Sequence, residues 1–288
     1  MDDHLSVYQH VFVQNLQDKG KSHSTQLAYG KDIDQFILFL RSIQIESAIT
    51  VQQAHIEQFA ADLRKKRYTE KSIVRKLNSI KGFLSFLVSK NVLSENPASL
   101  LKKPKIDQSA PRILSKMEYR ALRDACRGDR RISAIVELLL QTGMRISELS
   151  AVRGDDLLLD QQKMTVREPE TGESRVIPLN ASAIRAIREY QEIRPKTKEK
   201  IFFVTKTCKP FLVRNIRSAI DRYFKLAGVE NARVNDLRHT FIVGQLSAGM
   251  PLLYVSQIVG HKRLSTTEKY LQFLDKTMDS SKVKVEEL

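Results

Sequence analysis

Three short stretches of the chain carry side chains that could act together on a phosphodiester. Arg145 lies in TGMRISEL, Arg238 lies in VNDLRHTF, and His261 and Tyr270 both lie in IVGHKRLSTTEKY. Guanidinium groups bind the non-bridging oxygens of a phosphate bidentately and offset the charge that the transition state gains. A tyrosine oxygen can attack phosphorus, and an imidazole can hydrogen-bond a phosphoryl group or carry a proton. Together, these residue types could cleave a nucleic acid strand.

Each of these residues also has an ordinary structural interpretation. An arginine at the end of a helix, such as Arg145, is most often part of a surface ion pair, and Tyr270 could be a packing residue. His261 follows Gly260 and could stabilise a helix end, because a cation suits the negative end of the helix dipole. Single motif matches often arise by chance, so only the combination and order of the motifs support a functional interpretation.

In this order and spacing, the motifs resemble those of the tyrosine site-specific recombinases, which include phage integrases and Xer-type recombinases. LRHTF and GHKRLSTTEKY are the most specific of these motifs, and the resemblance extends over nearly the whole chain. It implies a helical N-terminal domain that binds core DNA, a linker and a mixed catalytic domain. It also implies that Arg145, Arg238, His261 and Tyr270 are catalytic.

The resemblance further implies strand cleavage and exchange through a covalent intermediate. Tyr270 would form a 3′-phosphotyrosyl link and release a 5′-hydroxyl, which would then attack the partner strand. Such a reaction needs neither ATP nor a divalent metal, so we expect no cofactor and no metal site. The outcome could be integration, excision, or the resolution of dimers or cointegrates, and the sequence does not distinguish these.

Asn235 is the first departure from the family pattern. The family has a histidine three residues before the second arginine, and this chain has Asn235 there. An asparagine amide can orient a phosphate through a hydrogen bond, but it cannot act as an acid or a base. Asn235 is therefore a candidate site residue with an orienting role. His239 follows Arg238 directly, belongs to the same family motif, and is expected to have a structural role.

The second departure is the absence of a lysine from a predicted hairpin turn. Family members usually have a lysine there that protonates the departing 5′-oxygen, but this stretch reads VREPETGESRVIPL and contains glutamates instead. The nearest cations are Lys163, Arg167 and Arg175. Arginine is a poor acid because its pKa lies above about 12. The sequence leaves open which of these cations, if any, replaces the lysine.

These departures leave two alternatives to an active recombinase. A DNA-binding protein with the same fold could have lost the chemistry and could act as an architectural or regulatory factor. A relaxing activity like that of a type IB topoisomerase would use the same tyrosine chemistry without exchanging strands between partners. We interpret the chain as an enzyme because the nucleophile and both arginines are present.

The elements that would position these residues fall into two parts of the chain. Residues 1–101 contain four stretches with apolar residues at three-to-four spacing, which predicts a bundle of four helices. The third helix should begin at Thr50, a potential cap. The prolines and polar residues of 102–111 predict a linker. Residues 112–275 would form the catalytic domain, so we expect a mainly α fold with a small β-hairpin or sheet.

Several elements are expected within residues 112–275. Helices should begin after the caps Ser115 and Asp129, and the apolar run ISAIVELLLQ predicts a buried helix that ends just before TGMRISEL. KMTVRE and SRVIPL flank PETG and predict a β-hairpin, and IFFV at 201–204 predicts a short strand. Further helices follow. A bound phosphate would compensate the charge that Arg145 carries at the end of the buried helix.

The charge of the chain predicts a polyanionic partner. Lys and Arg number 48 against 33 Asp and Glu, which gives a net charge of +15, and both 1–108 and 109–288 are basic. Binding of basic residues to phosphates releases counterions, so we expect double-stranded DNA as the partner. The family resemblance implies an inverted-repeat core site on which the protein forms dimers and then a tetramer.

Other classes of protein fit the sequence poorly. No apolar run approaches the ~20 residues of a membrane span, and MDDHLSVYQH lacks the pattern of a secretory signal. Cys126 and Cys208 lie far apart and lack the spacing of metal ligands, which favours a reduced, cytoplasmic protein. We therefore expect no membrane partner.

The last residues of the chain, 276–288, have two interpretations. They could dock in trans onto a neighbouring protomer, with Val283, Val285 and Leu288 as apolar anchors. They could equally form a frayed terminus, because chain ends are disordered unless packing holds them.

Overall fold

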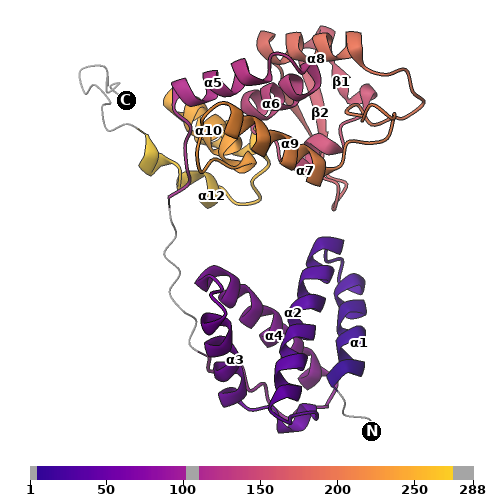
Figure 1. Ribbon diagram of the computed structural model, residues 1–288, viewed down its shortest axis with the longest axis vertical. Coiled ribbons are helices and arrows are strands. Elements are labelled where there is room, and N and C mark those ends of the chain that lie inside the picture. The colour runs from indigo at the N-terminus through magenta and orange to yellow at the C-terminus, as the bar shows by residue number, and fades with distance from the viewer. Residues whose placement is uncertain (1–4, 102–109, 275–288) are drawn as a thin grey trace, which may run out of the picture. The chain divides into compact units, whose positions relative to one another are not determined.

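The computed structural model describes residues 5–101 and 110–274, and the chain divides into two compact units, Met1–Ser109 and Ala110–Leu288 (Figure 1). Most of the linker predicted at 102–111 and the whole tail predicted at 276–288 lie outside the described residues. Within the described residues, no helix has both the length and the apolar character needed to cross a membrane. Each unit has its own apolar core.

The N-terminal unit is a helical bundle, as the apolar spacing predicts. Its buried residues lie at the expected spacing, as with Phe36 and Leu40 on the second helix and Ile80 and Leu84 on the fourth. Side chains of Ser22 and Thr69 cap the second and fourth helices. The α-helices described in this unit are α1 Leu5–Asp18, α2 His23–Ser42, α3 Gln53–Lys65 and α4 Glu70–Ser89.

The cap predicted at Thr50 is wrong. Thr50 is the last residue of a short 3-10 helix, Ala48–Thr50, and α3 begins three residues later at Gln53. The Nδ1 atom of His55 accepts a hydrogen bond of 3.2 Å from the backbone N–H of Gln52, the residue that precedes α3. Burial of Ala48 and Val51 accompanies the 3-10 turn and the residue after it, so the apolar Val51 belongs to this turn region and not to α3.

A buried carboxylate joins two helices of this unit. The Asp32 side chain of α2 is 1% exposed and accepts hydrogen bonds from Arg75, Lys76 and Ser79, all on α4. A buried charge is tolerated only when partners surround it, since burial removes its hydration. This cluster therefore fixes α2 against α4.

The C-terminal unit surrounds one apolar helix with shorter helices and a small sheet. The helix α6 carries the run predicted to be buried, and α5, α8 and α10 pack around it (Figure 1). The caps Ser115 of α5 and Asp129 of α6 are confirmed by their side-chain hydrogen bonds. The α-helices described here are α5 Lys116–Cys126, α6 Arg130–Thr142, α7 Ile146–Ser150, α8 Ala181–Ile193, α9 Val213–Leu226, α10 Val234–Ser247, α11 Leu252–Val259 and α12 Ser265–Glu268.

The predicted β-hairpin is confirmed. Strands β2, Lys163–Arg167, and β3, Ser174–Pro178, pair in antiparallel register with Lys163 opposite Pro178 and Val166 opposite Arg175. A two-residue strand, β1 at Leu157–Leu158, adds to the far side of β2, in the order β1-β2-β3. The fold class expected from the sequence, mainly α with a small sheet, is therefore confirmed.

The strand predicted at IFFV is wrong. Ile201 and Val204 each form only an isolated bridge, to Arg153 and Pro210 respectively. Phe202 and Phe203 are buried because they pack on Tyr190, whose ring centroid lies 5.3 Å from the first and 5.2 Å from the second. The apolar composition thus reflects aromatic packing, which local sequence cannot distinguish from burial in a sheet.

Candidate active site

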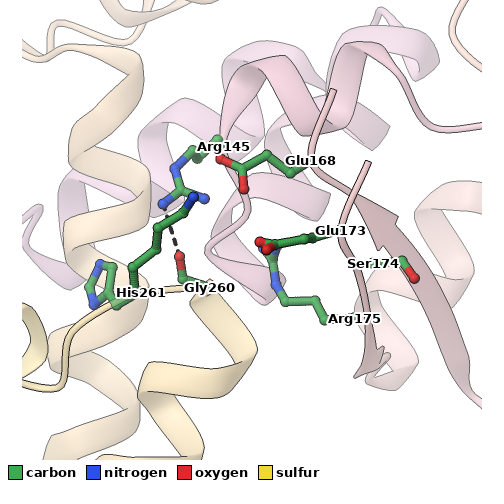
Figure 2. A pocket seen from close by; sticks show the side chains of 8 residues that line it. Arg145, Glu168, Glu173, Ser174, Arg175, Gly260 and His261 are labelled. Carbon is green, nitrogen blue, oxygen red and sulfur yellow. Dashed lines mark hydrogen bonds between the residues drawn. The ribbon is translucent and has the colours of Figure 1, made fainter. Parts of the chain in front are cut away.

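A sharp turn at the end of α6 positions Arg145. Gly143 has a φ of 61°, and a Cβ atom there would lie 2.3 Å from a ring carbon of Phe241. Only glycine suits both the backbone conformation and the contact. Directly after the turn, Arg145 starts α7, and its Nη2 donates a hydrogen bond of 2.9 Å to the backbone carbonyl of Gly260 (Figure 2).

Glu148 holds two arginines from different parts of the fold. Its side chain is fully buried and accepts hydrogen bonds from the backbone N–H and Nη1 of Arg145, at 2.7 and 2.8 Å. It also accepts two bonds of 2.9 Å from Arg175 on β3. Burial opposes ionisation of this carboxyl, but the bonds from Arg175 and Arg145 outweigh it and lower its pKa. Glu148 is therefore the anionic anchor of the site.

Arg238 is a buried cation beside this pair. It lies on α10, is 6% exposed, and donates from Nη1 to the carbonyl of Gly143 at 2.7 Å. Burial, and then the neighbouring Arg145, lower the pKa of Arg238 to about 10, so its guanidinium remains charged at neutral pH. Both predicted arginines thus donate to backbone carbonyls that fix their positions.

A pocket of about 190 Å³ opens beside these groups. Arg145, Arg175 and the carbonyl of Gly260 line it, together with two glutamates of the β2–β3 turn, Glu168 and Glu173 (Figure 2). Guanidinium groups, a histidine and a lysine that converge on one pocket suit an anion with several oxygens. The lining residues are Arg145, Glu168, Glu173, Ser174, Arg175, Gly260, His261 and Lys262.

Gly260 and His261 follow the end of α11. Gly260 has a φ of 70°, and a Cβ atom there would lie 2.8 Å from Nη1 of Arg175. His261 Nδ1 forms a hydrogen bond of 2.8 Å with the hydroxyl of Thr267. Burial, and then Arg238, Arg145 and Arg175, lower the pKa of His261 to about 4. The imidazole is therefore neutral at neutral pH and can donate an N–H to a bound anion without carrying charge.

Tyr270 is buried and hydrogen-bonded through its hydroxyl. It is 8% exposed, and its Oη lies 2.7 Å from Nδ1 of His239. His239 Nε2 in turn lies 3.1 Å from the amide nitrogen of Asn235. The ring of His261 stacks on Tyr270 with an interplanar angle of 16° and a centroid distance of 6.3 Å. Burial raises the pKa of Tyr270, although Arg238 opposes that effect.

The structure brings the sequence-predicted residues into one region. Arg145 and His261 line the pocket, Arg238 donates to the turn that precedes Arg145, and Tyr270 stacks on His261. Asn235 joins the group through His239.

Two contributions were not anticipated from the sequence. We expected only a structural role for His239, and its contact with the nucleophile candidate could not be read from sequence because 31 residues separate them. Lys262 lines the pocket beside His261. Its place within GHKR was a usable signal, since it directly follows a predicted site residue.

Of the three cations considered as replacements for the hairpin lysine, only Arg175 lines the pocket. Arg167 donates two hydrogen bonds to Asp156, at 3.0 and 2.7 Å. Lys163 pairs with Pro178 at the end of the hairpin away from the turn. Side chains alternate between the two faces of a sheet, so the side chains of Lys163 and Arg175 project from opposite faces.

Comparisons with known proteins point to one family. Residues 112–277, more than half of the chain, match the phage integrase family, and residues 10–91 match its N-terminal SAM-like domain. Tyrosine recombinase XerC of Roseiflexus castenholzii is 29% identical over 273 residues, which cover 90% of this chain and 87% of that protein. More than one relative is named in the same way.

Two solved structures are similar in fold. The Tn1549 transposon integrase in complex with a circular intermediate DNA has a TM-score of 0.76 at 18% identity, and the match covers 91% of this chain and 94% of that one. A lambda integrase dimer bound to a COC′ core site has a TM-score of 0.76 at 14% identity, covering 91% and 97%. At these identities the likeness concerns the fold alone.

Proposed function

Because the chain belongs to the phage integrase family of tyrosine recombinases, we propose that it cleaves and rejoins DNA strands through a phosphotyrosyl intermediate on Tyr270. The observation that carries this proposal is the gathering of cations at one site. Arg145 and Arg175 line one pocket, Arg238 donates to the turn that precedes Arg145, and the buried Tyr270 stacks on the pocket residue His261. Cations without a metal suit a phosphodiester whose transition state gains negative charge. This arrangement supports strand cleavage more directly than DNA binding alone.

Arg145 and Arg238 bind the non-bridging oxygens of the scissile phosphate. Each donates to a carbonyl of a tight turn, Gly260 and Gly143 respectively, so neither side chain must be ordered when DNA binds. A guanidinium has five N–H groups, and these bonds leave donors for the substrate. His261, neutral at working pH, adds a hydrogen bond to the same phosphate.

Tyr270 attacks phosphorus and forms a 3′-phosphotyrosyl link while the 5′-oxygen departs. The phenolate is a fair leaving group in the reverse direction, so the covalent link conserves the energy of the phosphodiester. The 5′-hydroxyl of a partner strand can then attack the link and restore a continuous strand. No ATP and no metal ion take part in these steps.

Lys262 supplies the proton that the departing 5′-oxygen needs. The position where relatives carry a hairpin lysine is occupied by an acidic turn, and Arg175 is held by Glu148 and by the carbonyl of Ile258. Lys262 lines the same pocket as Arg145 and His261. An ammonium can release a proton to an alkoxide, whereas a guanidinium is a poor donor.

The substrate is double-stranded DNA with an inverted-repeat core site. The net charge of +15, spread over both parts of the chain, supports binding to a long polyanion. The lambda integrase dimer on a core site supports a dimer of this chain on each site. Exchange of all four strands between two duplexes needs four active sites, so we propose a tetramer in the complete complex. Integration, excision and resolution all fit this chemistry.

A nicked suicide substrate tests the proposal. Cleavage near the nick releases a short strand, so that religation fails and the covalent adduct accumulates as a slower band on a denaturing gel. We expect an adduct with the wild type and none with Tyr270→Phe, which leaves the ring in place. If the wild type binds DNA without forming an adduct, the chain is a DNA-binding factor. Relaxation of plasmid without strand exchange between sites would identify a topoisomerase-like activity instead.

A further inference from the structure

We propose that His239 is the base that removes the proton of Tyr270 during cleavage, an inference that rests on the proposed function. The buried hydroxyl of Tyr270 must lose its proton as it attacks phosphorus, and it has a partner at hydrogen-bond distance. The Nδ1 atom of His239 lies 2.7 Å from Oη, within the range required for direct proton transfer. A group that contacts the reacting atom in this way is a catalytic residue.

The other candidates near Tyr270 are less suited to this step. His261 stacks on the face of the tyrosine ring, with an interplanar angle of 16°, and its Nδ1 bonds to Thr267. Among the hydrogen bonds of the described residues, that of the Tyr270 hydroxyl joins it to His239 and that of His261 Nδ1 to Thr267. Asn235, at the position where the family has a histidine, cannot accept a proton. Among the described residues, the imidazole of His239 is the titratable group with a hydrogen bond to the nucleophilic oxygen.

Asn235 positions the base. Its amide lies 3.1 Å from Nε2 of His239, on the side of the ring opposite to Tyr270. The amide nitrogen of Asn235 can donate to Nε2, and after a 180° rotation of the amide group its oxygen can accept from Nε2. Asn235 can therefore hydrogen-bond to either neutral tautomer of His239 and to the imidazolium. In the tautomer that accepts the tyrosine proton, Nε2 carries hydrogen and the amide oxygen accepts it. The asparagine thus orients a base that lies one helical turn further along α10.

The surroundings of His239 keep it neutral and ready to accept. Burial lowers its pKa, Asp236 raises it, and Arg238 lowers it, with a net downward shift from 6.5. Asp236 and Arg238 face it from α10, Tyr270 faces it from the segment after α12, and His261 faces it from the turn after α11. A neutral imidazole at neutral pH is the form that a base requires.

Cleavage moves one proton from Tyr270 and delivers another to the leaving oxygen. The Oη–H bond of Tyr270 breaks and the proton moves to Nδ1 of His239, while Oη forms a bond to phosphorus. The bond between phosphorus and the 5′-oxygen breaks, and that oxygen takes a proton from Lys262. When the 5′-hydroxyl of a partner strand attacks the phosphotyrosyl link, its proton returns to the neutral amine of Lys262 as the new bond to phosphorus forms. The bond between phosphorus and Oη breaks, and the imidazolium of His239 returns its proton to Oη.

Single-turnover cleavage of two suicide substrates tests the assignment. One carries an ordinary phosphodiester, and the other has sulfur in place of the bridging 5′-oxygen, which departs without needing a proton. We expect His239→Ala to slow adduct formation by about 10²–10⁴-fold on both substrates, as loss of a base does. Lys262→Ala should form the adduct slowly on the phosphodiester substrate and at close to the wild-type rate on the sulfur substrate. His10→Gln, at an exposed histidine of α1, serves as the control with the wild-type rate.

The pH dependence gives a second readout. The wild-type rate should fall as pH decreases through the pKa of His239, below its ordinary 6.5, because the protonated imidazole cannot accept. That acid limb should be absent from His239→Ala. If this variant does not fold, the same measurements on Asn235→Ala, an exposed position, should show a smaller rate loss on both substrates.

The possible outcomes are distinct. If His239→Ala forms the adduct at the wild-type rate on the sulfur substrate, His239 protonates the leaving 5′-oxygen instead, and the proposal is overturned. A wild-type rate for His239→Ala, with its acid limb intact, would also overturn it, while the phosphotyrosyl mechanism would stand. If the wild type forms no adduct on either substrate, both the mechanism and the role of His239 are refuted.

Discussion

Replacement of Glu148 by glutamine should test how the active site is held together. Glu148→Gln preserves the shape of the side chain but turns one carboxylate oxygen into an amide nitrogen. Oε1 accepts from Nη1 of Arg145 and Nη1 of Arg175, while Oε2 accepts from the backbone of Arg145 and Nη2 of Arg175. Whichever oxygen is replaced, two donors lose their acceptor and face another donor.

The magnitude follows from the burial of these groups. Removal of one partner from a buried ion pair costs about 3–5 kcal/mol. The Arg145 side chain is 35% exposed and that of Arg175 is 19% exposed, so water compensates part of the loss. We therefore expect the free energy of unfolding to decrease by about 3 kcal/mol, at the lower end of that range. For a unit of this size, each kcal/mol shifts the melting temperature by about 2–4 °C, so the expected decrease is about 6–12 °C.

Thermal unfolding followed by circular dichroism measures this change. Glu173→Gln is the matched control, because Glu173 lines the same pocket but is exposed, and an exposed substitution changes stability by only about 0.5 kcal/mol. The pKa of Glu148 is lowered in the folded state, so its contribution is present above the unfolded value near 4.5 and is lost as pH falls through the folded value. The melting temperatures of Glu148→Gln and of the control should therefore become equal at acid pH. A melting temperature for Glu148→Gln equal to that of the control would refute the anchoring role.

Two further changes test the turn and the neutral histidine. Gly143→Ala should destabilise the fold by about 3 kcal/mol or more, because the backbone there has a positive φ and the added Cβ would collide with Phe241. The matched control Gly244→Ala has no atom near the added Cβ and should stabilise α10 by up to about 1 kcal/mol. Urea unfolding checks this pair, and equal effects would contradict the geometry. Between about pH 7.5 and 5, the contribution of His261 to the free energy of unfolding should fall by about 1 kcal/mol, a value reduced for solvent screening. The reason is that unfolded His261 takes up a proton while the folded side chain stays neutral until about pH 4. His261→Gln should reduce this loss, and an unchanged pH dependence would exclude the low pKa.

Local sequence information was sufficient for most of the elements. The buried helix α6 and its cap Asp129 were predictable because a continuous apolar run and a capping side chain act within a few residues. The β2–β3 hairpin was predictable for the same reason, since turn and strand residues lie side by side in the chain. The strand expected at IFFV failed because the burial of Phe202 and Phe203 depends on Tyr190, which lies on another element.

The sequence by itself determined which chemistry the chain can attempt. The types and order of Arg145, Arg238, His261 and Tyr270 indicate phosphoryl transfer to tyrosine, and they also showed where the chain departs from its family, at Asn235 and in the hairpin turn. Those departures were visible because they are single-residue differences within short motifs. Their consequences were not visible, because they depend on residues elsewhere in the fold.

Only the tertiary structure decided which groups meet. Arg145 reaches the carbonyl of Gly260 across 115 residues, and Tyr270 reaches His239 across 31. Contacts of this kind depend on how helices pack, and no local pattern encodes the distance between two side chains that different elements carry. The fold thus places the imidazole of His239 beside Tyr270, the candidate nucleophile, although Asn235 occupies the position of the family's histidine. It also places Lys163 on the face of the sheet opposite to that of Arg175.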